Sequence, residues 1–160
     1  MIFVDIDGVL ADFNAAAQVL FEKTKSARDI EAEIGSRAFW DSIRAVEDFY
    51  LHLPKMADAD TLWEGVRQYD FHPTILTGVP MSMPNVPFHK REWCEKYFPG
   101  AEVITCLSRD KHAFCQRGDI LIDDWPRYRR SWEHAGGIFI VHESAASTLA
   151  QLAIQFKDSR

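Results

Sequence analysis

Cysteine is scarce in this sequence, and the cysteines that occur do not pair. Cys94, Cys106 and Cys115 are odd in number and show no C-x-x-C spacing, which argues against a disulfide framework and against a zinc knuckle. The six histidines are scattered, without a His-x-x-His pair. Each histidine is therefore better explained as a structural or exposed side chain than as a metal ligand.

Long apolar runs, low-complexity tracts and internal repeats are missing as well. No stretch of 18 apolar residues occurs, which argues against a membrane-spanning helix. The first residues already read as a buried strand, so we expect no signal or transit peptide and a cytoplasmic protein. With 160 residues, 47% of them hydrophobic, the chain can bury the core of one globular domain with a modest insertion.

Basic residues are fewer than acidic ones. The sequence has 18 Lys and Arg against 24 Asp and Glu, which gives a net charge of −6. This balance weakens the case for a protein that holds a long polyanion by general electrostatics, so we expect no stable nucleic-acid partner. A small anionic substrate is still compatible with this charge where positive side chains gather locally.

The most informative feature that is present is a pair of acids directly after a short apolar run. Residues 2–4, Ile-Phe-Val, predict a strand buried on both faces, and Asp5 ends it because an unpaired buried carboxylate is costly. Asp5 and Asp7 are two residues apart, so in an extended chain both point to the same side. Two acids in an ordinary Asp-Gly turn are the alternative, and this motif alone leaves both interpretations open.

Two further apolar runs end in polar side chains. Residues 119–124 read Asp-Ile-Leu-Ile-Asp-Asp, and residues 74–78 read Thr-Ile-Leu-Thr-Gly. Crowding several carboxylates at one edge of a sheet costs Coulomb energy unless a cation or a cationic side chain neutralises them. Oxygen ligands without a Cys or His cluster favour Mg²⁺. The sequence therefore indicates a magnesium site at the carboxyl ends of these strands.

Strands and helices alternate along the chain, which predicts a mainly parallel sheet with both faces covered. In such a sheet, ligands bind beyond the carboxyl ends of the strands. We expect Asn14 to cap a first helix, Ser36 to cap a second, and Asp58 or Asp60 to open another. Strands are predicted at 2–4, 74–77, 102–106, 120–122 and 138–141; helices are predicted at 15–21, around 39–43 and 62–66, and at 89–97, 126–134 and 144–156, with a helical or irregular connection at 24–35.

The stretch from residue 13 to residue 72 is far longer than a crossover helix between two strands requires. We therefore expect a catalytic α/β core of residues 1–12 and 73–160, and a helical cap insertion of residues 13–72. Part of this insertion can form a lid over the ends of the strands.

These residues resemble the haloacid dehalogenase superfamily of phosphotransferases. A narrower resemblance, to the 5'(3')-deoxyribonucleotidases, covers most of the chain. The superfamily's four motifs occur in order as Asp5-Ile-Asp7-Gly8-Val9, Leu76-Thr77-Gly78, Lys111 and Asp123-Asp124. The narrower match rests on residues 5–13, Phe39-Trp40, and residues 93–98, 107–111, 118–124 and 131–134.

The resemblance implies a Rossmann-like α/β fold with five parallel strands in the order 5-4-1-2-3 and a small helical cap inserted after strand 1. It implies a Mg²⁺-dependent phosphatase that hydrolyses nucleoside monophosphates, with deoxyribonucleotides expected, through an aspartyl-phosphate intermediate. Asp5 is the expected nucleophile, and Asp7 the expected acid and then base. Thr77 and Lys111 complete the expected catalytic set, and the expected metal ligands are Asp5, Asp7 through its backbone carbonyl, Asp123 and Asp124.

In this family, aromatic side chains of the insert line a pocket for the nucleobase. Adjacent helix residues diverge by about 100°, so we expect one of Phe39 and Trp40 to face the base and the other to pack in the lid. Packing in a core is the alternative for both, and an exposed surface position is the alternative for Arg109. The expected substrate-binding residues are Gly78, Arg109, Phe13, Phe39 and Trp40, with Phe49 or Tyr50 as a further aromatic.

The chain departs from the family where Thr77 is followed by Gly78-Val-Pro80, since the family usually has a Ser before its Pro. Contacts to the phosphate or sugar are therefore expected to differ. The alternatives are a phosphatase for another small phosphate ester or a nucleic-acid 3'-phosphate, and a catalytically silent binding protein of the same fold. We expect the protein to bind a small nucleotide substrate and not to associate with a membrane. Since some relatives in the family dimerise, a homodimer is compatible with the resemblance.

Overall fold

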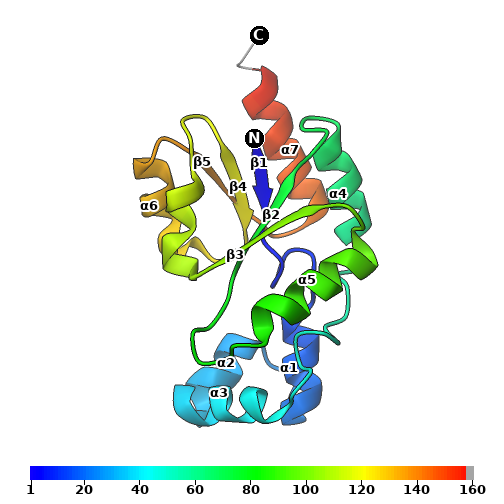
Figure 1. Cartoon of the computed structure of the whole chain (residues 1–160), viewed down its shortest axis with the longest axis vertical. Coiled ribbons are helices and arrows are strands. Elements are labelled where there is room, and N and C mark those ends of the chain that lie inside the picture. The colour runs from blue at the N-terminus through cyan, green and yellow to red at the C-terminus, as the bar shows by residue number, and fades with distance from the viewer. Residues whose placement is uncertain (158–160) are drawn as a thin grey trace.

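A five-stranded, all-parallel sheet forms the centre of the molecule (Figure 1). The computed structural model describes residues 1–157. Its strand order, β3-β2-β1-β4-β5, is the predicted order 5-4-1-2-3 read from the other edge, so the predicted α/β fold is confirmed. The strands are β1 (Ile2–Val4), β2 (Thr74–Gly78), β3 (Glu102–Cys106), β4 (Ile120–Asp123) and β5 (Ile138–Val141).

Alternation along β1 divides the apolar core between the two faces of the sheet. Ile2 and Val4 belong to the larger cluster of buried side chains, whereas Phe3 between them belongs to a second cluster. Successive side chains of a strand point to opposite faces, so β1 is buried on both sides, as its unbroken apolar run predicted. In the second cluster the rings of Phe3 and Trp132 meet edge to face, with centroids 5.5 Å apart.

Helices cover both faces of the sheet. Buried side chains of α4, α5 and α7 contribute to the larger cluster, and Trp132 of α6 contributes to the second one. No helix within residues 1–157 is long and apolar enough to cross a membrane. The helices are α1 (Phe13–Phe21), α2 (Ala27–Ile34), α3 (Ser36–Ala45), α4 (Ala59–Arg67), α5 (Val86–Tyr97), α6 (Arg129–His134) and α7 (Ala145–Lys157), with 3₁₀ helices η1 (Ser108–Phe114) and η2 (Pro126–Tyr128).

The predicted insertion of residues 13–72 contributes to two places in the fold. Helices α1, α2 and α3 lie together beyond the carboxyl ends of the strands, below the sheet in Figure 1. Helix α4 packs against α7 beside the sheet, and Gly65 permits this approach because a Cβ there would overlap the side chain of Leu149. The division into a catalytic core and a cap stays a prediction, with α1–α3 as the part placed over the strand ends.

The first helix begins differently from the prediction. Its cap is Asp12, whose Oδ1 accepts a hydrogen bond from the backbone N–H of Ala15 at 2.8 Å. Asn14, the predicted cap, instead accepts from the backbone N–H of Ala27 at 2.8 Å and so joins α1 to α2. Asp and Asn cap helices about equally well, so sequence spacing alone could not choose between them. Most of the stretch 24–35 forms α2, the helical one of the two predicted alternatives.

Two other predicted caps use their side chains to contact a different helix. Ser36 is the first residue of α3, with Gly35 at the cap position, and its hydroxyl donates to Glu31 at 2.7 Å. Asp58 occupies the cap position of α4, but its side chain makes no hydrogen bond to that helix. Its carboxylate accepts from the backbone N–H of Ala145 at 2.7 Å and so caps α7 instead. Ser36 therefore joins two consecutive helices, α2 and α3, whereas Asp58 joins two helices that are far apart in the chain.

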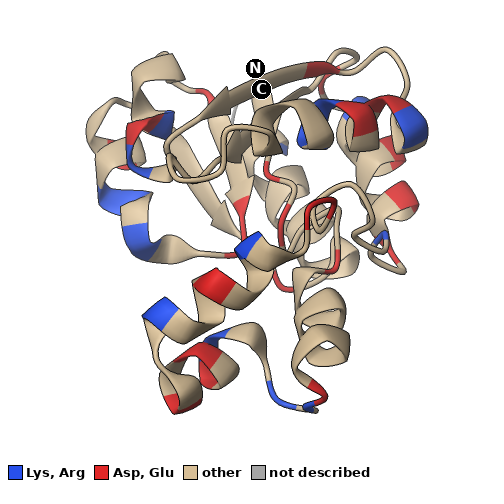
Figure 2. Ribbon diagram, turned by 60° about the horizontal axis from the view of Figure 1, so that its bottom comes forward, with Lys and Arg blue, Asp and Glu red and all other residues tan. Residues whose placement is uncertain are grey.

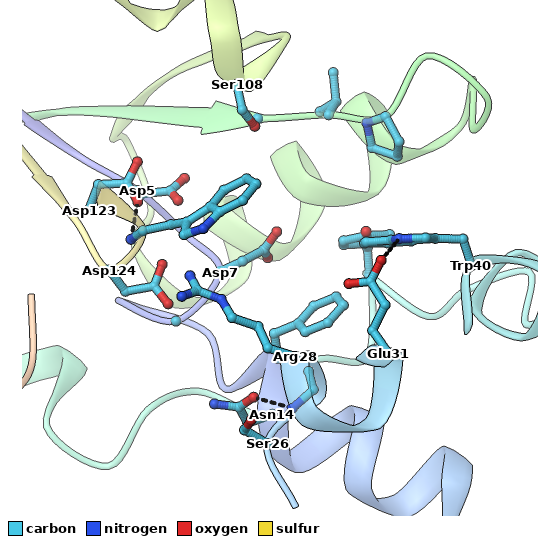
Figure 3. A pocket seen from close by; sticks show the side chains of 18 of the residues that line it. Asp5, Asp7, Asn14, Ser26, Arg28, Glu31, Trp40, Ser108, Asp123 and Asp124 are labelled. Carbon is cyan, nitrogen blue, oxygen red and sulfur yellow. Dashed lines mark hydrogen bonds between the residues drawn. The ribbon is translucent and has the colours of Figure 1, made fainter. Parts of the chain in front are cut away.

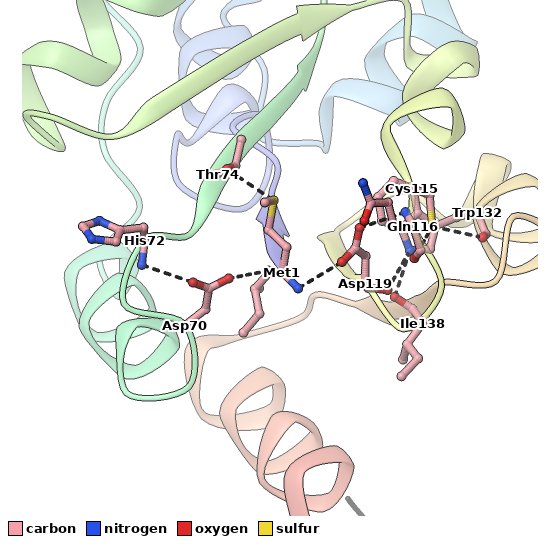
Figure 4. A network of polar contacts seen from close by, with 10 residues as sticks. Met1, Asp70, His72, Thr74, Cys115, Gln116, Asp119, Trp132 and Ile138 are labelled. Atoms are coloured by element: carbon pink, nitrogen blue, oxygen red, sulfur yellow. Dashed lines mark hydrogen bonds and ion pairs between the residues drawn. The ribbon is translucent and has the colours of Figure 1, made fainter.

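Two acids close the amino end of the sheet (Figure 4). Asp119 accepts hydrogen bonds from the amino group of Met1 at 2.9 Å and from the backbone N–H of Gln116 at 2.8 Å. Asp70 accepts from the backbone N–H of Ile2 at 2.7 Å and from the backbone N–H of His72 at 3.1 Å. All four carboxylate oxygens therefore have N–H partners, which fix the start of β1.

Candidate active site

The carboxyl end of the sheet brings together side chains from distant parts of the chain. Asp5 follows β1, Asp123 ends β4, and Lys111 lies on η1 after β3. Lys111 Nζ is 3.1 Å from Asp5 Oδ1 and 2.7 Å from Asp123 Oδ2, and the lysine is only 4% exposed. Acidic positions gather on the loops at this end (Figure 2). The structure therefore brings the acids of the first and fourth motifs into contact with the predicted lysine of the third.

Three carboxylates at this end fit a divalent cation. Asp5, Asp123 and Asp124 each offer one oxygen, and these oxygens all lie within 4.8 Å of one another. Gly8, at φ 79°, allows the approach of Asp124, because a Cβ at Gly8 would overlap its carboxylate. The buried Oδ1 of Asp5 has its ion pair with Lys111 but no well-directed hydrogen bond from the described residues. A set of hard oxygen donors of this kind suits Mg²⁺.

The pKa values of these acids also indicate a site for a cation. Burial, followed by repulsion from Asp5 and Asp123, raises the pKa of Asp124 to about 7. Burial and then Asp5 also raise the pKa of Asp123, although Lys111 opposes this shift. Burial lowers the pKa of Lys111, but Asp5 and Asp123 raise it by more, so the pKa is above its ordinary value and this lysine stays charged. One lysine therefore offsets only part of the negative charge, and a cation would complete the balance.

The carboxylate of Asp7 lies outside the three-acid group and is held by a lysine that the sequence analysis did not identify. Lys90 Nζ donates to Asp7 Oδ2 at 2.7 Å, to the hydroxyl of Thr77 at 3.0 Å and to the carbonyl of Gly78 at 2.7 Å. Burial raises the pKa of Asp7, and Lys90 lowers it in part. The separation of Asp7 from the three-acid group agrees with a metal contact through its backbone carbonyl, which stays a prediction.

A sequence signal for Lys90 did exist. Lys90 is 0% exposed and lies on α5 in the same stripe as the buried Val86, Trp93 and Cys94. Side chains three and four residues apart share one face of a helix. A lysine within such an apolar stripe needs a partner for its charge, and the acids at the end of β1 were the available partners.

The hydroxyl of Ser108 is a second missed feature. Thr77 is 0% exposed, and its hydroxyl accepts from Lys90. Next to it, a Cβ on Gly78 would overlap the Ser108 hydroxyl, which lines a cavity that opens over the acids. This hydroxyl has no hydrogen-bond partner within residues 1–157. Ser108 therefore places an oxygen where a side chain at position 78 would stand, which accounts spatially for the Gly in the second motif.

A cavity of about 740 Å³ opens over the acids, a volume within the usual range for small-ligand sites. Phe13, Trp40 and Tyr50 are among the residues that line it. Phe39 also borders the cavity but is 1% exposed and stacks on Phe21, with centroids 5.0 Å apart. Of the two adjacent aromatics, Trp40 therefore has more surface to offer a ligand.

Arg109 is not brought to this cavity. Its side chain is 66% exposed and lies 3.8 Å from Asp110, in the ion pair between their charged groups. The tight turn of η1 directs Lys111 inward and leaves Arg109 in solvent. The prediction that Arg109 binds substrate therefore gains no support, and the surface alternative describes its position.

An arginine from α2 lines the cavity instead. The guanidinium of Arg28 lies 5.3 Å from the ring centroid of Trp125, which follows the Asp123-Asp124 pair. Its charge also lowers the pKa of Asp124, against the stronger effect of burial. Figure 3 shows Arg28 between the acids and Trp40. This contact could not be read from the sequence, because it depends on how α2 approaches the loop after β4.

The fold occurs in a solved structure of another protein. A hydrolase from Streptococcus pneumoniae TIGR4 matches over 95% of this chain and 97% of its own, with a TM-score of 0.52 and 14% sequence identity. The two proteins share a fold. A HAD hydrolase of family IA, variant 3, from Entamoeba histolytica HM-1:IMSS matches over 86% of this chain and 81% of its own, with a TM-score of 0.40 and 15% identity. No family model matches the chain, and no curated protein is similar in sequence.

Proposed function

We propose that this protein is a Mg²⁺-dependent phosphatase of the haloacid dehalogenase type that hydrolyses nucleoside monophosphates. The observation that carries the proposal is the contact of Lys111 with both Asp5 and Asp123 beneath a cavity lined by aromatic side chains. The acids supply a nucleophile and oxygen ligands, the lysine supplies positive charge, and the aromatics supply an apolar surface for a base.

In the first step, a carboxylate oxygen of Asp5 attacks phosphorus. The new O–P bond forms as the ester P–O bond breaks, and the leaving alkoxide takes a proton from Asp7. The raised pKa of Asp7 supports this role, because a carboxyl group with an ordinary pKa is almost fully ionised at neutral pH. Lys90 holds this carboxylate at 2.7 Å and so fixes its orientation.

In the second step, water attacks the aspartyl-phosphate. Asp7 removes a proton from this water, the bond between Asp5 and phosphorus breaks, and inorganic phosphate leaves with Asp5 restored. Lys111 stabilises the negative charge on Asp5 and on the phosphoryl oxygens. The Ser108 hydroxyl lines the cavity and is the donor proposed for those oxygens. Thr77 is fully buried beside Lys90 and does not line the cavity, so the role expected for its hydroxyl is not supported by its position. Mg²⁺ held by Asp5, Asp123 and Asp124 would neutralise further charge as the two anions approach.

Phosphate release tests this function. The panel contains p-nitrophenyl phosphate, several sugar phosphates, and ribo- and deoxyribonucleoside 5'- and 3'-monophosphates, each with Mg²⁺ and with chelator. We expect Mg²⁺-dependent release, with kcat/KM for nucleoside monophosphates roughly tenfold or more above that for sugar phosphates. Equal rates on sugar phosphates would leave a phosphatase of other specificity, and no release from any ester would favour a silent binding protein.

A further inference from the structure

Helix α2 places a fixed carboxylate at the far end of the cavity from the acids. Glu31 lines the cavity, and its Oε1 accepts from the Ser36 hydroxyl at 2.7 Å and from Trp40 Nε1 at 3.0 Å. Two donors on one oxygen hold the side chain in place. Figure 3 shows Glu31 beside Trp40, away from Asp5 and Asp123, with the other carboxylate oxygen on the cavity side.

That second oxygen, Oε2, has no partner in the part of the chain that the structure describes. Among residues 1–157 it accepts no hydrogen bond, and no lysine or arginine lies in ion-pair contact with Glu31. A half-buried carboxylate in an apolar lining is stabilised when an N–H group bonds it. The cavity therefore presents a pre-positioned acceptor with negative charge to whatever part of a ligand reaches this end.

The two ends of the cavity differ in what they can bind. The acid end, with Lys111 and room for a cation, suits the phosphate of the substrate. Arg28, one helical turn before Glu31 on α2, lies between the ends. The end at Glu31 and Trp40 combines an aromatic surface with a single free carboxylate oxygen. This pairing suits a planar heterocycle that offers an N–H at its edge.

Nucleobases differ in how well they meet such an oxygen. Cytosine, adenine and guanine carry an exocyclic amine, whose N–H groups donate to a carboxylate. Thymine and uracil offer only a ring N–H between two carbonyl oxygens, and those oxygens are repelled by the negative charge. An unsuitable base therefore leaves the half-buried carboxylate oxygen of Glu31 unpaired or is repelled by it, and both effects discriminate between bases.

Resting on the phosphatase function proposed above, we infer that Glu31 selects nucleoside monophosphates whose base carries an exocyclic amine over those of thymine and uracil. In this site Trp40 supplies the apolar surface, and Ser36 and Trp40 together orient the acceptor. Glu31 is thus a specificity-determining residue on the lid rather than part of the chemistry at Asp5.

The sharpest test compares dCMP with dUMP, which differ in the base only by the amine or carbonyl at C4 and the adjoining ring proton. We expect the wild-type protein to favour dCMP in kcat/KM by about tenfold or more. In Glu31→Gln, the amide oxygen can still accept from Ser36 and Trp40 while the amide nitrogen donates toward a carbonyl. The dCMP to dUMP ratio should then fall by about tenfold. The ratio is taken within each protein, so a general loss of folded enzyme cancels.

Glu33→Gln is the matched control, since it makes the same change on the same helix. Glu33 pairs with Lys23 and Lys25 at 2.6 Å and does not line the cavity, so its ratio should equal that of the wild type. Wild-type preference for dUMP and dTMP, or an unchanged ratio in Glu31→Gln with both nucleotides hydrolysed, would overturn this inference alone. A stronger preference for phosphoethanolamine or phosphocholine would overturn it too, and absence of all nucleotide hydrolysis would overturn the proposed function with it.

Discussion

The two ends of the parallel sheet both carry buried or partly buried carboxylates, but their hydrogen bonding differs. At the amino end, every oxygen of Asp70 and Asp119 accepts from an N–H group. At the carboxyl end, Oδ1 of Asp5 and Oδ1 of Asp7 are buried without a well-formed hydrogen bond from the described part of the chain. Acids of the first kind stabilise the fold, whereas acids of the second kind keep lone pairs available for a ligand.

The carboxyl end is also the electrostatically costly one. Burial raises the pKa of Asp7, Asp123 and Asp124, with neighbouring acids adding to the effect. Lys90 and Lys111 offset only part of this repulsion. A cluster that disfavours its own ionised form and opens to a cavity is typical of a site that binds a cation and an anion together.

The same chemical change at the two ends should have opposite results. Asp5→Asn removes the proposed nucleophile, so we expect kcat on p-nitrophenyl phosphate to fall by about 10⁴-fold or more while the fold is kept. Asp119→Asn should leave kcat unchanged and lower the free energy of unfolding by about 1–2 kcal/mol, because it weakens hydrogen bonds from charged and backbone donors. Steady-state kinetics and urea unfolding measure the two quantities.

This pair of variants can break the comparison in either direction. Wild-type turnover by Asp5→Asn on every ester tested would end the proposed mechanism. A large loss of kcat in a folded Asp119→Asn protein would show that the amino end takes part in the chemistry as well.

Lys90→Gln should give the next largest effect. The variant removes the charge 2.7 Å from Asp7 Oδ2, and we expect a loss of about 10²–10³-fold in kcat. Because Lys90 lowers the pKa of Asp7 against burial, its removal should raise that pKa further. The alkaline limb of the pH profile, which requires protonated Asp7, should then move to higher pH.

The pH profile separates this role from a purely structural one. Lys96→Gln is the control, since Lys96 is exposed on the same helix and lies 4.8 Å from the ring centroid of Tyr97. It should leave both kcat and the profile unchanged. A folded Lys90→Gln variant with reduced kcat but an unmoved alkaline limb would contradict the coupling to Asp7.

Ser108→Ala should have a smaller effect on activity and none on stability. The hydroxyl lines the cavity beside Gly78 without a partner among residues 1–157, so only a bond to the phosphate is lost, and kcat/KM should fall by about tenfold. Thermal unfolding should be unchanged. Ser42→Ala, which removes a hydroxyl bonded within α3, is the control for activity. Unchanged kcat/KM in Ser108→Ala would exclude this phosphate contact.

Much of the fold follows from local sequence. Each strand has a short apolar centre, and the two-sided burial of β1 follows from the lack of polar alternation in residues 2–4. The acids of the site could be predicted because they directly follow such runs. Helix starts were less predictable, since Asp12 and Asn14 are both good caps and only packing decides between them.

The missed side chains depend on contacts between distant segments. Ser108 reaches the cavity because η1 lies against the end of β2, and Arg28 does so because α2 approaches Trp125. Neither approach leaves a local pattern. Phe39 and Trp40 show the same limit: their divergence on the helix was predictable, but which of them faces the cavity depends on packing against Phe21.

The acids at the carboxyl end also predict a stability that depends on pH. Burial, then Asp5, raises the pKa of Asp124 to about 7 and also raises that of Asp123, whereas an Asp in an unfolded chain has a pKa of about 3.9. The folded protein therefore binds these protons more tightly than the unfolded chain does. The resulting stability is present below about pH 4 and is lost as the pH rises through about 7.

Mg²⁺ should reverse this loss, because it binds the ionised carboxylates. We expect the Tm of the chelated protein to fall between pH 5 and pH 8, and 10 mM Mg²⁺ to raise it at pH 8 by about 3–6 °C for a Kd of ~1 mM, with a smaller rise at pH 5. Differential scanning fluorimetry at both pH values measures this. Asp124→Asn should weaken the Mg²⁺ shift, whereas Asp119→Asn at the amino end should keep it. An equal Mg²⁺ shift at pH 5 and pH 8, or one retained in full by Asp124→Asn, would place the cation elsewhere and remove the basis for contrasting the two ends.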